Sequence, residues 1–331
     1  MPQSVCSQLN PLLDRPPASE GSPLEGMGLS SITRVTESPQ SVSITPIMSV
    51  TFWGVRGSIA SQGASTMRYG GNTSCVDVRL ADGSVIIFDA GTGLHPLGNA
   101  LLAPSDPVRA HLFISHLHWD HIQGLPFFAP AYIPSSTLTL LGPPTAERPL
   151  QQLLADQMRP PYFPVTMDAM AARLSFHHLY DGSHYRLPGA TVEAHRLNHP
   201  RATLGYRLTV NDKILVYATD NEPYGDKTRA QHLPAPSGLL SLAKDADVLI
   251  MDAQYTPEEY PHKVGWGHST YMDALRLAQA AHVKQLVLFH HDPSRSDHEL
   301  DTIVTLCNAW SAKQGCDFTC VAAAEGVSLQ V

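Results

Sequence analysis

The sequence predicts a layered α/β sandwich over residues 48–331, preceded by a tail without regular structure. Short apolar segments alternate with stretches of helical pattern beyond residue 48, which is typical of sheets covered by helices. These apolar segments fall into two groups along the chain, and we expect mostly antiparallel pairing within each group. Ser, Pro, Gln and Gly dominate residues 1–47, so this segment buries too little apolar surface to fold and is expected to be disordered. A start of translation at Met48 would explain residues 1–47 equally well, and both interpretations stay open.

The first group of predicted strands ends near residue 141. The sequence Asp82-Gly83 between two apolar runs indicates a hairpin turn. The strands of this group are expected at 50–55, 75–80, 85–88, 111–115 and 137–141. A Pro-rich stretch over residues 142–175 follows, with a helix inside a long loop.

The second group is expected to hold strands, then helices that alternate with further strands. Ser269 or Thr270 can cap the first of these helices, and Asp273 is favourable in its first turn. The expected strands are 191–197, 203–210, 214–218, 247–251, 285–289 and 326–330, and the expected helices are 270–282 and 298–313.

Composition excludes several classes of protein. The 331 residues carry 22 Lys and Arg against 30 Asp and Glu, a formal net charge of −8, which argues against a protein that wraps duplex nucleic acid. No apolar run approaches the roughly 18 residues of a membrane span, and no secretory signal is evident. The 5 cysteines form no CxxC pair, which is typical of reduced thiols in a cytoplasmic protein.

The main functional signal is the segment His116-Leu117-His118-Trp119-Asp120-His121, directly after an apolar strand. Imidazole is the commonest zinc ligand in proteins, and a carboxylate adds negative charge and a hard oxygen donor. Four candidate ligands within six residues exceed what one ion needs locally, so the segment indicates two ions that share a site.

Further ligands must come from elsewhere in the chain. His199, Asp220 and His290 each follow an apolar strand, and strand ends on a rigid sheet are where sites are usually built. Each of them taken alone would more often be an ordinary polar residue at a strand end. Together with the first cluster, they favour a metal site.

This order of residues resembles the metallo-β-lactamase superfamily. The resemblance covers residues 49–331 and implies a four-layer αββα sandwich with a binuclear metal site along one edge. It implies that His116, His118 and His199 hold one ion, that Asp120, His121 and His290 hold the other, and that Asp220 bridges both. His291 competes with His290, which we prefer because it directly follows the strand. The segment Phe88-Asp89-Ala90-Gly91-Thr92-Gly93 also matches the family, and Asp89 is a candidate to orient a ligating histidine.

The resemblance is strongest to the branch with ribonuclease Z and cyclic phosphodiesterases. Asp220 stands where zinc β-lactamases typically have a cysteine. Gly267-His268-Ser269-Thr270 resembles a segment of ribonuclease Z whose histidine assists the leaving oxygen. Asp252 occupies the place of the carboxylate that pairs with that histidine, so we expect an Asp252–His268 pair. The alternative is that His268 only begins a helix.

The sequence therefore predicts a phosphodiesterase that cleaves a small nucleotide-like diester, cyclic ones included. A hydroxide that bridges the ions would be the nucleophile, and Asp120 would accept its proton. The cofactors would be two divalent ions, with zinc the first choice from the histidine-rich set and Mn²⁺ or Fe²⁺ left open. The alternatives are a ribonuclease Z-type RNA endonuclease and a lactone or thioester hydrolase. An inactive metal-bound interaction module is disfavoured by the complete ligand set.

Two residues, Arg56 and Tyr162, are candidates for contact with the substrate. Arg56 could reach a substrate phosphate, although a salt bridge or a solvated loop position explains it equally well. Tyr162, in the Pro-rich 159–165 loop, could cover a base or sugar, although such loops more often pack on the surface. The expected partner is a small molecule, with no duplex nucleic acid and no membrane. A homodimer stays open, because related enzymes are often dimers.

Overall fold

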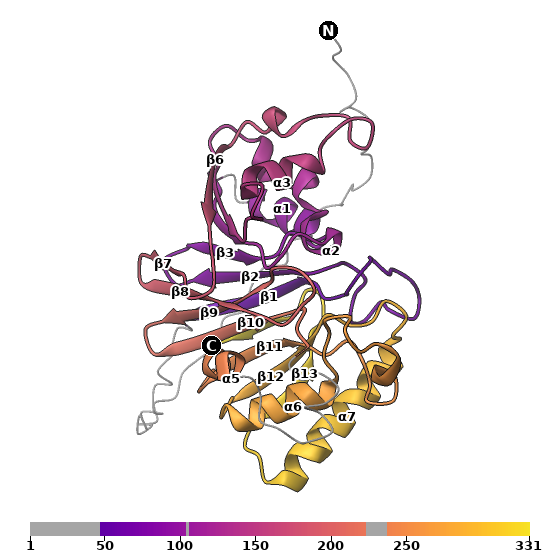
Figure 1. Ribbon diagram of the computed structural model, residues 1–331. Coiled ribbons are helices and arrows are strands. Elements are labelled where there is room, and N and C mark those ends of the chain that lie inside the picture. The colour runs from indigo at the N-terminus through magenta and orange to yellow at the C-terminus, as the bar shows by residue number, and fades with distance from the viewer. Residues whose placement is uncertain (1–46, 104–105, 223–236) are drawn as a thin grey trace, which may run out of the picture. The chain divides into compact units, whose positions relative to one another are not determined.

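Two seven-stranded sheets form the centre of the computed structural model, which describes residues 47–103, 106–222 and 237–331 (Figure 1). The first sheet has the order β14 (Ser328–Gln330), β1 (Met48–Gly54), β2 (Cys75–Leu80), β3 (Val85–Phe88), β4 (Arg109–Phe113), β5 (Thr137–Gly142) and β6 (Arg173–His178). The second has the order β13 (Thr319–Ala322), β12 (Gln285–Phe289), β11 (Val248–Asp252), β10 (Lys213–Ala218), β9 (Leu204–Val210), β8 (Ala190–Arg196) and β7 (His184–Leu187). The predicted tail lies outside the described residues except for Ile47, so it stays a prediction.

Helices cover the outer face of each sheet, which gives four layers (Figure 1). The described α-helices are α1 (Leu94–Leu102), α2 (Trp119–Ile122), α3 (Leu150–Asp156), α5 (Ser237–Ala243), α6 (Tyr271–Ala280) and α7 (Asp297–Gln314). The first three pack on the first sheet, and the last three pack on the second. The expected four-layer αββα sandwich is confirmed. None of these helices combines the length and the apolar character that crossing a bilayer requires.

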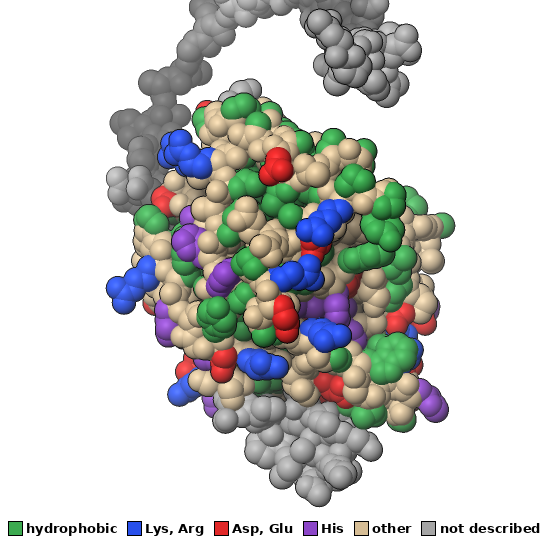
Figure 2. Space-filling model, turned by 45° about the horizontal axis from the view of Figure 1, so that its top comes forward, with side chains coloured by type: hydrophobic (Ala, Val, Ile, Leu, Met, Phe, Trp, Pro, Cys, Tyr) green, Lys and Arg blue, Asp and Glu red, His purple; other side chains and the backbone are tan. Residues whose placement is uncertain are grey.

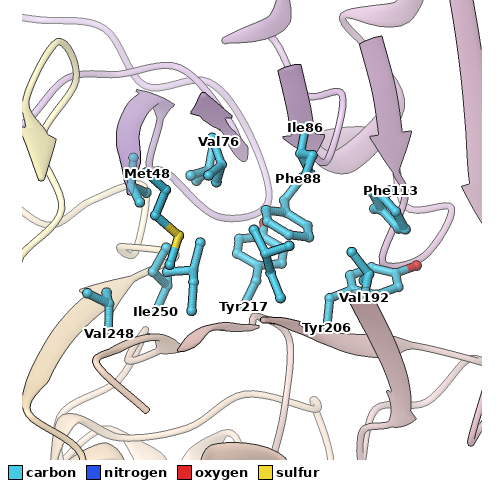
Figure 3. Packing of buried hydrophobic residues seen from close by; sticks show 14 of the residues in the cluster. Met48, Val76, Ile86, Phe88, Phe113, Val192, Tyr206, Tyr217, Val248 and Ile250 are labelled. Carbon is cyan, nitrogen blue, oxygen red and sulfur yellow. The ribbon is translucent and has the colours of Figure 1, made fainter. Parts of the chain in front are cut away.

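The main core lies between the two sheets. Figure 3 shows side chains of the first sheet, among them Phe88, that point toward Tyr206 and Tyr217 of the second. The Phe88 ring stacks on Tyr217 at a centroid distance of 5.2 Å and on Tyr206 at 5.8 Å. Such pairs contribute about 0.5–1.5 kcal/mol beyond the burial of their area. This packing holds the two sheets in a fixed position against each other. The residues at the strand ends of one sheet are thereby positioned relative to those of the other.

Each sheet is half parallel, which corrects the expectation of mostly antiparallel pairing. β3, β4, β5 and β6 run parallel in the first sheet, as do β10, β11, β12 and β13 in the second. Parallel neighbours need a crossover connection, and α1 and α6 supply two of these between β3 and β4 and between β11 and β12. The direction of pairing depends on the path of these crossovers, which the pattern inside a strand does not encode.

Most expected elements form within a few residues of their predicted bounds, but some strands and helices were not predicted. β6 and β7 are edge strands with half-exposed or exposed side chains, so they lack the apolar alternation that identifies a strand. α1 contains Pro96 and Gly98, which weaken its helical pattern. α1 packs through buried leucines on the first sheet, so tertiary packing stabilises it.

Capping fixes the starts of α6 and α7. Thr270, one of the two predicted caps, accepts from the backbone N–H of Asp273, and Asp273 Oδ2 accepts from the Thr270 backbone N–H at 3.0 Å. Ser296 and Glu299 form the same reciprocal pair at the start of α7. Each pair satisfies backbone donors that the first turn leaves without a partner.

We expect Ser296→Ala to lower the free energy of unfolding by about 1 kcal/mol, because it removes the oxygen that accepts from Glu299. Thermal denaturation measures the effect. Thr302→Ala is the matched control on the same helix: Thr302 is an exposed interior residue that bonds the carbonyl of His298, so alanine should not lower stability there. Equal losses in both variants would contradict the role of the cap.

Candidate metal centre

The candidate ligands meet because of the parallel pairing. Asp89 follows β3, and His116 follows β4, which runs parallel to it. Asp220 and His290 follow β10 and β12, which both run parallel to β11. The carboxyl ends of parallel strands lie at the same edge of a sheet, so these residues gather at one edge of the sandwich.

The first group holds His116, His118, His199 and Asp220. One nitrogen or oxygen of each lies within 4.8 Å of the others. His199 Nδ1 lies 3.0 Å from the Gly267 carbonyl oxygen, so this nitrogen carries the hydrogen and Nε2 keeps its lone pair. His116 Nε2 lies 3.5 Å from Asp220 Oδ2. This is the set expected for one ion.

The second group holds Asp120, His121, Asp220 and His290, again with one atom of each within 4.8 Å of the others. His121 Nε2 and His290 Nε2 both lie 3.1 Å from Asp220 Oδ1. Asp120 Oδ2 lies 3.1 Å from His121 Nε2 and 3.2 Å from His290 Nε2. Asp220 thus presents one oxygen to each group, which is the arrangement that a bridging carboxylate needs.

The donor set fits divalent cations. The buried atoms His116 Nε2 and His121 Nε2 have no hydrogen-bond partner, although carboxylate oxygens lie close to both. Nitrogen and oxygen atoms that lie close together without hydrogen bonds are expected where both point at a common cation. Burial also lowers the pKa of His116, His118 and His199, which favours the neutral form that a metal ligand takes. Nitrogen donors with carboxylates suit zinc, and they also suit manganese or iron.

Asp89 stands behind His121, which it contacts through Nδ1 at 2.7 Å. The same carboxylate accepts from the Ser115 backbone N–H at 2.7 Å and from the Tyr217 hydroxyl at 2.8 Å. It therefore fixes the His121 ring with Nε2 toward Asp120 and Asp220. Of its partners, neither Ser115 nor Tyr217 was singled out from the sequence, because an apolar strand gives no sign that its tyrosine reaches a buried carboxylate.

The side chains of His290 and His291 point in different directions, and only that of His290 points toward the candidate ligands. His290 belongs to the second group, whereas His291 Nε2 lies 2.9 Å from the Ala323 carbonyl oxygen, away from it. The structure thus places His290, the preferred candidate, in the second group of candidate ligands. Gln254 Oε1 lies 3.1 Å from His290 Nδ1 and so orients the ring. Gln254 was not predicted to matter, and its position two residues after β11 is the one local signal that could have indicated it.

Asp252 and His268 form a buried pair beside the two groups. His268 Nδ1 lies 2.7 Å from Asp252 Oδ2, and the His268 ring stacks on His290 at 5.0 Å. Burial opposes the charged imidazole, but Asp252 outweighs it and raises the pKa of His268 to about 9. Atoms of Asp252 and His268 also lie within 4.8 Å of atoms of Asp220 and His290. The structure therefore brings the expected pair to the edge of the candidate metal site.

Glu222 was not predicted to matter, yet it anchors the loop that carries His268. Its buried carboxylate accepts from the backbone N–H of Gly265 and of Gly267, each at 3.0 Å, and from the Tyr260 hydroxyl. These partners lie about forty residues away along the chain, so no local pattern could reveal them.

The structure contradicts a substrate role for Arg56, whose side chain is fully buried. Its guanidinium donates to the carbonyl oxygens of Gly70, Asp292 and Arg295 at 2.6–3.1 Å. These bonds tie the first sheet to the loop after His290, so no donor is presented to a substrate. Tyr162 is 89% exposed, and none of its described contacts joins it to the metal groups, so its substrate role stays a prediction.

The beta-lactamase superfamily domain matches residues 85–291 of the chain. Ribonuclease Z of Staphylococcus haemolyticus is 26% identical over 299 residues, which cover 76% of this chain and 90% of that protein. Ribonuclease Z of Staphylococcus aureus is 25% identical over 285 residues, which cover 73% and 88%.

Solved structures show the same fold. The metallo-β-lactamase fold protein YhfI from Bacillus subtilis has a TM-score of 0.61 at 19% identity and covers 87% of this chain and 100% of its own. The short form of human tRNase Z has a TM-score of 0.59 at 19% identity, with 86% and 99% covered. A diphosphatase from the PhnP family has a TM-score of 0.58 at 17% identity, with 86% and 98% covered.

The four-layer fold and the histidine–carboxylate groups at its edge define a metal-dependent hydrolase. The match over residues 85–291 shows its family: the chain belongs to the beta-lactamase superfamily, in the metallo-β-lactamase fold. The resemblance inferred from the HxHxDH segment and its downstream residues is confirmed.

We expect Arg56→Lys to lower the free energy of unfolding by about 3 kcal/mol, because a lysine cannot replace the guanidinium across three buried carbonyls. Chemical denaturation measures this change in the free energy of unfolding. Arg68→Lys is the control: Arg68 is exposed and pairs with Asp301, so its loss should be below about 1 kcal/mol. Normal stability with weakened substrate binding in Arg56→Lys would instead support the original interpretation.

Glu222→Gln should loosen the 260–268 loop, because either orientation of the amide places an N–H₂ against backbone donors. We expect faster hydrogen–deuterium exchange at residues 260–267 and a stability loss of about 1–3 kcal/mol. Glu258→Gln, an exposed change in the preceding segment, is the control and should leave the exchange unaltered. Unchanged protection in Glu222→Gln would show that Glu222 is not the anchor.

Proposed function

We propose that the protein is a phosphodiesterase that uses two divalent ions to cleave a small nucleotide-like diester, cyclic ones included. The observation that carries this proposal is the Asp252–His268 pair at 2.7 Å, beside a site whose two groups share Asp220. Hydrolysis of a phosphodiester needs a proton for the leaving oxygen, and this pair places a hydrogen-bonded imidazole next to the candidate ligands.

The residues proposed to bind the two ions are those of the two groups described above. His116, His118 and His199 would hold one ion, Asp120, His121 and His290 the other, and Asp220 both. Two divalent ions bound there would polarise the phosphoryl group and activate water for attack. Zinc is the proposed metal because nitrogen donors predominate.

The chain's own residues supply the remaining steps. Burial opposes the ionised form of Asp120, but His121 and His290 lower its pKa, so the carboxylate stays ionised. In the proposed reaction it would accept the proton of the attacking water. The Ser58 backbone N–H donates to Asp120 Oδ2 at 2.7 Å and holds it in place. Asp252 holds His268 through Nδ1, which leaves Nε2 to give a proton to the leaving oxygen. General acid catalysis of this kind typically contributes about 10²–10⁴-fold.

A second candidate is an RNA endonuclease of the ribonuclease Z type. It is favoured by the matched relatives, which are ribonucleases Z. The net charge of −8 favours a small substrate instead, because RNA binding draws much of its affinity from Lys and Arg on phosphates. A lactone or thioester hydrolase is the third candidate, and it would not need His268 as an acid.

The deciding experiment assays the full chain, with its metal content measured, on cyclic mononucleotides, bis-(p-nitrophenyl) phosphate, precursor tRNA and a lactone panel. We expect turnover of the small diesters. Cleavage of precursor tRNA alone would favour the second candidate, and turnover of lactones alone the third. No diester turnover by fully loaded protein would contradict the proposal.

His268→Ala should lower the turnover of cyclic mononucleotides about 10²–10⁴-fold, because the leaving oxygen loses its proton donor. Metal content should stay at the wild-type value. Asp220→Ala is the comparison and should lose metal, because Asp220 belongs to both groups. Loss of metal in His268→Ala would mean that His268 is a ligand, and unchanged turnover would mean that no acid acts there.

A further inference from the structure

An exposed tryptophan lies on the loop that carries His268. The Trp266 ring is 56% exposed, although large aromatic side chains usually bury most of their surface. Lys263 Nζ lies 4.1 Å from the centroid of this ring and 5.8 Å from that of Tyr255. The Tyr255 ring in turn lies 5.9 Å from the His268 ring. These contacts connect Trp266 to the candidate acid.

The backbone places Trp266 at the rim of the metal groups. The next residue, Gly267, lies so close to His199 that a Cβ on it would come within 2.2 Å of Nδ1. Neighbouring Cα atoms are about 3.8 Å apart, so the Trp266 backbone lies one residue away from the glycine that contacts the candidate ligand His199. His268 follows directly and stacks on His290. Trp266 is therefore an exposed residue whose backbone lies next to a candidate ligand and two positions before His268.

The tryptophan is also held in place. Glu222 fixes the backbone N–H groups of Gly265 and Gly267, which flank it on both sides. Lys263 lies over one face of the ring, and this cation–π contact favours the observed orientation of the indole. A ring whose position is already fixed loses little entropy when another ring stacks on it.

Trp119 is the other exposed tryptophan near the site, at 77% exposure. It lies between His118 and Asp120, but within the described residues no ring or hydrogen-bond contact orients its side chain. Trp266 is the tryptophan with both a fixed ring and a link to His268.

We propose that Trp266, held by Lys263, forms a subsite on which a planar aromatic ring of the substrate stacks, such as a nucleobase on the leaving side of the diester. The inference rests on the proposed function for the position of the phosphate, which the metal groups would hold. Stacking accepts any base, because every base has a π-face. The subsite thus selects aromatic nucleotides over sugar phosphates without reading a particular base.

Binding of adenosine monophosphate and of ribose 5-phosphate tests this, because the two ligands differ only in the base. Isothermal titration calorimetry on the metal-loaded full chain should show tighter binding of adenosine monophosphate. Trp266→Ala should weaken that binding about 5- to 100-fold and leave ribose 5-phosphate within about 2-fold. Trp266→Phe should restore most of the affinity. Tyr180→Ala, which removes an exposed aromatic ring of the β6–β7 connection, is the control and should change the affinity for neither ligand.

Three results would overturn the subsite: no preference of the wild type for adenosine monophosphate, unchanged binding in Trp266→Ala, or equal losses for both ligands. Diester turnover is measured separately on the same preparations. A wild type that prefers adenosine monophosphate through Trp266 yet hydrolyses no diester would contradict the proposed function and leave the subsite standing.

Discussion

The structure depends on one buried carboxylate, that of Asp220. Its two oxygens face two different sets of imidazoles, and Asp120 lies against one of these sets, His121 and His290. Burying two carboxylates is costly unless positive charge balances them nearby. The histidines around them are kept in fixed rotations by Asp89, Gly267 and Gln254, so their nitrogens converge on the carboxylate oxygens. The layers of the sandwich hold these contacts together from segments far apart in the chain.

Strained backbone at the strand ends aims three of these side chains. Asp89, Asp220 and His290 all have left-handed φ values, of 61°, 48° and 59°. Such conformations cost of order 1–3 kcal/mol each and persist only where the surroundings enforce them. The core between the sheets provides that enforcement: Tyr217 stacks on Phe88 and donates its hydroxyl to Asp89. The same residue therefore stabilises the sandwich and holds the site. On the face that Figure 2 shows, histidine side chains appear in small groups among charged and apolar side chains.

The candidate metal ligands and the Asp252–His268 pair are held by different parts of the fold. His116, Asp220 and His290 follow strands, which the sheets make rigid, whereas His118, Asp120 and His121 lie at the start of or within α2. The two members of the Asp252–His268 pair come from different elements: Asp252 ends β11, whereas His268 lies on a loop that Glu222 ties to the end of β10. Loops placed on a rigid scaffold are where specificity usually resides. The 260–268 loop carries both His268 and Trp266, and its Gly267 carbonyl orients His199, so this loop connects the proposed substrate contacts to the candidate ligands.

The sequence by itself determined the features that depend on short-range spacing. The HxHxDH segment after an apolar strand indicated the metal site, Asp82-Gly83 indicated the hairpin, and Thr270 with Asp273 indicated the start of α6. The position of His290 directly after β12 distinguished it from His291. Only the tertiary structure decided the burial of Arg56, the parallel half of each sheet, and the roles of Glu222, Gln254 and Tyr217. The physical reason is that spacing records which side chains share a local face. What surrounds a side chain depends instead on distant segments packed against it, and these are brought together only when both sheets and their crossovers have folded.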